Sequence, residues 1–131
     1  MYYICFRNTD MISKKVRIPL YGGDLFVMIA EDYEKEKNEL HKDWQHDRSD
    51  FIGYSEGNGN TYVVILNKKY IRNEIDLVSI IAHEADHITS FIFKRVGIKL
   101  DLDNDEPHAY LLGYLVEQIY KIYINNLILK K

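Results

Sequence analysis

The sequence lacks most features that would place a chain outside the ordinary globular class. Its 131 residues include one cysteine, two prolines and one tryptophan. Cys5 has no partner for an internal disulfide, and its apolar neighbours Ile4 and Phe6 predict a buried structural thiol. No run approaches the roughly 20 apolar residues of a membrane-spanning helix, and the first residues do not resemble a signal peptide. We therefore expect an unsecreted, cytoplasmic protein without membrane contacts.

An excess of basic residues is also absent. The chain carries 17 Lys and Arg against 20 Asp and Glu, which gives a formal net charge of -3. Proteins that bind a phosphate backbone usually need a basic surface, so we expect no nucleic-acid partner. The composition, 47% hydrophobic and 28% charged, fits one globular domain that spans residues 1–131.

The first half of the chain contains β-type patterns. Apolar runs at residues 2–6, 16–21 and 25–30 predict strands, and the Gly-Gly-Asp at 22–24 predicts a hairpin between the last two. Residues 31–50 are rich in charge, with only a narrow apolar stripe at helical spacing, and predict a solvated helix. His41 and His46 in this helix are five residues apart and point to different faces, so we expect both on the surface.

The second half predicts two more strands and two long helices. Residues 51–54 and 61–66 are strand-like and flank a connection rich in Gly and Asn. Asn73 is placed to cap a helix over residues 74–96 that Gly97 would end. A last helix is expected over 106–126, with Pro107 in its first turn. The fold class is therefore α+β, with an antiparallel or mixed sheet of three or more strands packed on two helices.

One motif in the first of these helices carries chemistry. His83 and His87 are four residues apart, so their side chains lie on one face with Cβ atoms about 5–6 Å apart. Two imidazoles at this spacing can converge on one zinc ion. Glu84 is turned about 100° from His83, which places it to act as general base on a water at the metal. The motif thus predicts one zinc ion per chain.

The remainder of this helix supports the interpretation, because an apolar stripe lies roughly opposite the two histidines. Its members are Val78, Ile81, Ala85, Ile88, Ile92 and Val96.

A catalytic zinc usually has three protein ligands, so a third must come from elsewhere. Ser90 and Phe93 occupy the positions where metzincin-type sites have Gly and His, which excludes that class. Glu106, 19 residues after His87, would open the next helix and is the favoured third ligand. His108 is the competing donor. Three carboxylates in the preceding loop are weaker candidates: Asp101, Asp103 and Asp105.

The last helix has small residues near the predicted ligand. Ala109 and Gly113 lie close to the same side as Glu106 and predict a close approach to the helix that carries the histidines. Tyr110 is placed to donate to a ligand or to a developing oxyanion, although core packing is the simpler expectation for it.

With Glu106, the motif resembles the gluzincin branch of the zincin metallopeptidases. Residues 60–120, and above all the two histidines, Glu84 and the helix start at Glu106, look like the small ImmA/IrrE-type enzymes and short phage-encoded zincins. The resemblance implies zinc on His83, His87 and Glu106, with Glu84 as base. It also implies a peptide or protein substrate that lies along an edge strand, here residues 51–54 or 62–66.

The expected activity is therefore hydrolysis of peptide bonds by a zinc metallopeptidase, in a bacterial cell or a phage-infected host. Two alternatives stay open at this point. A binding protein could keep the metal site without turnover and capture a host protein, or the two histidines could bind no metal. Asp86 inside the motif either orients a ligand or faces solvent.

Overall fold

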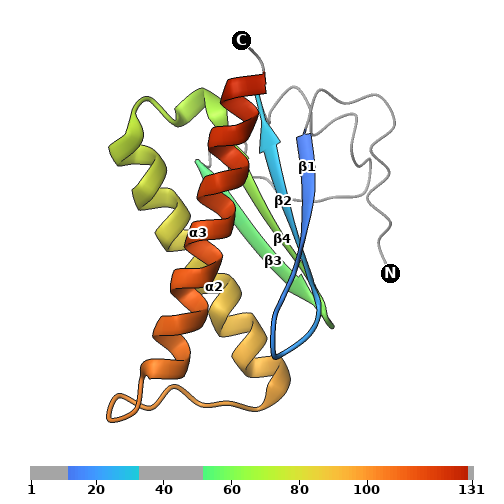
Figure 1. Cartoon of the computed structure of the whole chain (residues 1–131), viewed down its shortest axis with the longest axis vertical. Helices are drawn as coiled ribbons and strands as arrows, with labels where there is room; N and C mark the ends of the chain where they lie inside the picture. Colours follow the sequence, from blue (N-terminus) through green and yellow to red (C-terminus); the bar gives the residue numbers. More distant parts are fainter. Residues whose placement is uncertain (1–11, 33–51, 130–131) are drawn as a thin grey trace.

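The computed structural model describes residues 12–32 and 52–129, including the side chains of residues 12–32 and 52–127. Three predictions lie outside these residues: the strand at 2–6 with Cys5, most of the helix at 31–50, and the environment of His41 and His46. The described elements form an α+β fold with a four-stranded mixed sheet and two long helices (Figure 1). The predicted fold class is confirmed at this level.

The sheet has the strand order β1-β2-β4-β3. The first pair, β1 (Ile12–Arg17) and β2 (Asp24–Ala30), is antiparallel, as are β3 (Gly53–Asn58) and β4 (Thr61–Asn67). The two pairs join through β2 and β4, which run parallel. Within the described residues, β3 and β1 are therefore the edges, and β4 is paired on both sides.

The predicted hairpin at 22–24 is confirmed, but β1 lies earlier in the chain than expected. β1 ends at Arg17, and Leu20 in the loop has a positive φ of 66°. The loop needs a glycine at its end, because a Cβ at Gly23 would lie 2.6 Å from the carbonyl oxygen of Asn60. The close approach of Gly23 to Asn60 joins the hairpin of β1 and β2 to the hairpin of β3 and β4.

The predicted connection at 55–60 is mostly strand. β3 continues to Asn58, and only Gly59 and Asn60 form the turn, with a positive φ of 60° at Gly59. Gly, Glu and Asn have low strand propensity, so the expectation was wrong because pairing with the apolar strand β4 outweighs local preference.

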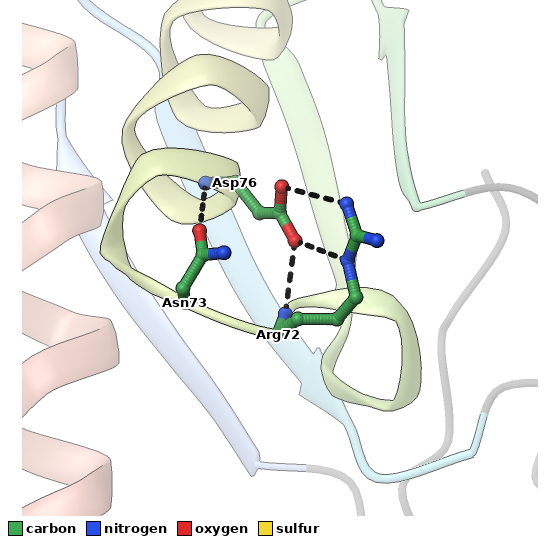
Figure 2. Close-up of polar contacts among 3 residues, drawn as sticks. All are labelled: Arg72, Asn73 and Asp76. Atoms are coloured by element: carbon green, nitrogen blue, oxygen red, sulfur yellow. Dashed lines mark hydrogen bonds and ion pairs between the residues drawn. The ribbon is translucent and has the colours of Figure 1, made fainter.

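Both predicted helices are present. α2 spans Glu74–Val96, and α3 spans Glu106–Leu129, three residues beyond the expected end. Asn73 caps α2 by accepting a hydrogen bond from the backbone N–H of Asp76 at 2.9 Å, and Gly97 ends it in the left-handed conformation. Figure 2 shows that the Asp76 carboxylate also accepts hydrogen bonds from Arg72.

The core lies between the sheet and the two helices, with α2 over β3 and β4 and α3 over β1 and β2 (Figure 1). The central part of the predicted stripe on α2 is fully buried: Ile81, Ala85, Ile88 and Ile92. Its two ends are not, since Val78 is 46% and Val96 36% exposed. Leu77 and Phe93 are buried instead, because the sheet and α3 together cover a wider arc of α2 than one stripe.

Among the described residues, no helix is both long and apolar enough to cross a membrane.

Candidate metal centre

The two histidines of the motif lie side by side on the exposed face of α2. Their Nε2 atoms are 3.1 Å apart, and their ring centroids are 4.8 Å apart. Two nitrogens each about 2.0–2.1 Å from a tetrahedral zinc ion would be separated by about 3.3 Å. A separation of 3.1 Å is that of a hydrogen bond between the two rings, and it is also close to the spacing of two ligands of one ion.

Glu84 lies on a neighbouring face of α2 and is only 4% exposed. Its side chain is directed at β3, because a Cβ added at Gly53 would lie 3.0 Å from its Cγ and 3.2 Å from its Oε1. No donor in the described part of the chain hydrogen-bonds this carboxylate. The oxygens of this carboxylate are not among the fully buried polar atoms that lack a partner, so a polar ligand, such as a water, can reach them.

Among the described residues, the edge strand beside Glu84 has backbone groups without a strand partner. Asn67 donates its backbone N–H to the carbonyl of Ile52 at 2.9 Å, and hydrogen-bonded pairs alternate with non-bonded ones along an antiparallel ladder. Counting from this pair, the N–H and C=O groups of Gly53 and Ser55 point away from β4. They face the open edge of the sheet, where an extended peptide could add as a further strand.

The structure chooses between the two edges that the sequence left open. Of the expected strands at 51–54 and 62–66, the second corresponds to β4, which is interior. The first corresponds to β3, the edge strand that packs on α2 next to the histidines.

The predicted third ligand, Glu106, is the first residue of α3 and is exposed. In the described residues, no group of three or more His, Cys, Asp or Glu side chains is placed to hold a metal ion. The structure thus brings His83 and His87 together and leaves the Glu106 carboxylate apart from them.

The backbone nevertheless starts α3 at the level of the histidine pair. Tyr120 donates a hydrogen bond to Glu74 at 2.8 Å, and His108 contacts Asp86 at 3.2 Å. The two contacts are 12 residues apart on each helix, from 74 to 86 on α2 and from 120 back to 108 on α3. The two helices therefore run antiparallel. By this antiparallel register, Glu106 lies at about the level of residue 88 along α2.

His108, the competing donor, is engaged elsewhere. Its Nε2 lies 3.2 Å from the Asp86 carboxylate, and its ring packs edge-on against Phe93 with centroids 5.7 Å apart. The Asp86 side chain is 55% exposed and also contacts His108, so it links α2 to α3. The weaker candidates Asp101, Asp103 and Asp105 are exposed in the loop between the helices.

Two expectations about α3 were wrong. Ala109 and Gly113 are exposed, and a Cβ at Gly113 would meet no atom within 4 Å, so no close approach occurs there. Tyr110 is 76% exposed, which rules out core packing. Helix α3 buries a different face, formed by Leu111, Leu115, Ile119 and Tyr123. Tyr110 remains accessible to a ligand, but no described contact ties it to the histidines.

Sequence reasoning missed the role of β3 in shaping the site. Gly53, Ser55 and Gly57 alternate along the strand and share the face toward α2. A Cβ at Gly57 would lie 3.3 Å from Phe91, whose ring stacks on His87 with centroids 6.4 Å apart. The alternation of small residues was visible in the sequence, but Ser55 and Gly57 were assigned to the connection at 55–60.

No protein-family model, curated protein or solved structure matches the chain. The attribution to a family therefore depends on the chain's own residues.

Proposed function

We propose that the chain is a zinc-dependent metallopeptidase of the gluzincin type with a zincin-like fold. The observation that carries this proposal is the pair of imidazole nitrogens 3.1 Å apart beside a buried glutamate. An edge strand next to the helix that carries the motif supports the same attribution, as does the start of α3 at about the level of residue 88. A cytoplasmic location is part of the proposal.

The residues fit a zinc ion. Imidazole and carboxylate are the donor types that zinc takes in sites with two His and one Glu, and His83 and His87 already have the required spacing. Glu106 would be the third ligand, by a change of its exposed side chain at the start of α3. The unpartnered Glu84 carboxylate would then face the position left for water.

When bound, zinc would supply a Lewis acid and lower the pKa of a water molecule. The Glu84 carboxylate would accept a proton from this water as its oxygen attacks the carbonyl carbon of the peptide bond. As the C–N bond breaks, Glu84 would deliver the proton to the amine nitrogen that leaves. Water is the nucleophile, so no covalent intermediate with the protein forms.

The substrate would be a peptide or an extended protein segment. Added to the open edge of β3, its main chain would hydrogen-bond to the outward groups of Gly53 and Ser55. This position would bring a peptide bond over the histidine face of α2, because β3 packs directly on that helix.

The test combines metal analysis with peptide profiling. Untagged protein, purified without chelator, should contain about one zinc per chain. Incubated with a mixture of synthetic peptides, zinc-loaded protein should produce cleavage products that mass spectrometry identifies. Glu84→Gln should keep the metal and lower kcat by about 10²–10⁴-fold, the usual contribution of a general base.

The control is His83→Ala, which should lose both zinc and activity. Zinc retained in the wild type without any cleavage, and a biological effect that Glu84→Gln leaves intact, would instead identify a metal-binding interaction protein. Protein that takes up no zinc even when zinc is supplied would overturn the proposal.

A further inference from the structure

Gly53 in the edge strand occupies a position with no room for a side chain. A Cβ there would lie 2.8 Å from Cγ1 of Ile80 and 3.0 Å from Cγ of Glu84. Both distances are shorter than an ordinary van der Waals contact between carbons, about 3.5–4.0 Å. Gly53 is not among the residues with positive φ, so the backbone conformation does not require glycine. The requirement comes from the space that α2 and Glu84 fill.

We infer that Gly53 is a positioning residue that seats the general base Glu84 beneath the edge strand, beside the histidine pair. This inference depends on the proposed function, since it assigns Glu84 its catalytic role. The missing side chain lets β3 approach α2 closely enough to bury the glutamate to 4% exposure. A larger residue would have to displace the carboxylate, Ile80 or the strand.

The displacement matters because proton transfer depends on position. A general base works within hydrogen-bond distance of the proton that it takes, and a misplacement of about 1 Å can cost about 100-fold in rate. The carboxylate itself is close to the added methyl, with Oε1 3.2 Å away. Gly53→Ala should therefore disturb Glu84 while leaving His83 and His87, which lie on the exposed face, able to bind zinc.

The kinetic test compares zinc-loaded variants on a peptide that the wild type cleaves. Gly53→Ala should lower kcat by about tenfold or more, with KM changed less than about twofold and zinc content unchanged. In a Glu84→Gln background the same substitution should have no further effect on kcat, because the group that Gly53 positions is gone. Val16→Ala is the control for stability as such, since Val16 is buried in β1 at the other edge of the sheet.

A second test measures the contact without activity. In chelator-treated protein, urea unfolding gives a double-mutant cycle for Gly53→Ala and Glu84→Ala. The loss of stability caused by Gly53→Ala should be smaller once Glu84 is truncated. Gly57→Ala is the matched control, because its added methyl would meet Tyr62 and Phe91 instead. Its effect should be the same with and without the Glu84 side chain.

The outcomes separate this inference from the proposed function. A wild type that cleaves peptides, with an unchanged kcat in Gly53→Ala, would overturn the positioning role and leave the metallopeptidase standing. A wild type that binds zinc and cleaves nothing would overturn both, and coupling in the cycle would then mark Gly53 as a packing glycine only. A lowered kcat together with coupling supports both.

Discussion

At the scale of single residues, Glu84 and the two histidines of the motif differ in burial. The histidines are exposed and adjacent, which suits ligands that take an ion from solvent. Glu84 is buried, which suits a group that must keep its position and act in a site of low dielectric. Residues next to each other in one motif therefore have different surroundings, because successive residues of a helix are turned by about 100°, and this difference fits the different roles that we propose for them.

The third ligand yields the first prediction. Glu106→Ala should weaken zinc binding by at least about tenfold, because a site with two imidazoles loses its remaining protein donor. His108→Ala should leave zinc affinity unchanged, since His108 contacts Asp86 and Phe93 rather than the histidine pair. Competition with a chromophoric chelator measures both values. The opposite pattern would transfer the ligand role to His108.

The start of α2 provides a prediction about pH. Hydrogen bonds from Arg72 hold the pKa of the Asp76 carboxyl below its usual range (Figure 2). Because this pKa is lower in the folded state, the ionised carboxylate adds stability above the unfolded-state pKa, and this stability is lost as pH falls through the folded-state pKa. The ion pair is accessible to solvent, with the Arg72 side chain 80% and the Asp76 side chain 20% exposed, so the effect should be small.

Urea unfolding of wild type and Asp76→Asn at a series of pH values checks this. Wild type should be the more stable at neutral pH, and the difference should disappear in acid below the folded-state pKa. Arg72→Gln should remove the same pH dependence while the cap from Asn73 stays in place. If the difference in stability between wild type and Asp76→Asn stays the same in acid, the ion pair with Arg72 is not the source of that difference.

At the scale of elements, strand β3 shows how pairing overrides local preference. The sequence predicts a connection from Ser55 onward, yet every residue of β3 up to Asn58 pairs with one of β4. The apolar strand β4 is buried on both faces and offers a ladder that the weaker strand completes. The glycines of β3 lower its strand propensity. They also let α2 pack closely against the strand, because a side chain at Gly53 or Gly57 would meet residues of that helix.

Helix α3 contains a glycine without a structural reason, and this gives another prediction. Gly113 lies within the helix, and a Cβ there meets nothing within 4 Å. Gly113→Ala should therefore raise the free energy of unfolding by about 0.5–1 kcal/mol, the usual difference in helix propensity. Chemical denaturation of the two proteins measures it. A loss of stability would indicate that the position packs against another surface.

At the scale of the whole molecule, the proposed zinc site would join parts of the chain that are distant in sequence. Its ligands come from the middle of α2 and the start of α3, and the sheet edge lies alongside. Zinc should therefore stabilise the folded protein, by about 2.7 kcal/mol when its free concentration is 100 times the dissociation constant. Chelator should lower the unfolding temperature accordingly in calorimetry.

His83→Ala provides the control for this prediction, because its unfolding temperature should not respond to zinc or to chelator. An equal response in wild type and variant would place the zinc effect outside the proposed site.

The sequence by itself determined the long elements and the motif. Helical periodicity with Asn73 and Gly97 at the ends predicted α2 residue by residue, and the spacing of His83 and His87 predicted their convergence. These features are local: capping and the four-residue spacing act within one turn of helix. Local physics therefore suffices for the fold class and for the convergence of two of the three proposed ligands.

Only the tertiary structure decided which strand lies at the edge, which face of α3 is buried and what surrounds Glu84. These depend on contacts between residues far apart in the chain, such as Gly53 with Glu84 and His108 with Asp86. The parallel pairing of β2 with β4 places β3 outermost, and no local pattern encodes that choice. Position in the sheet is a property of the assembled core, because each strand takes the place that buries the most apolar surface.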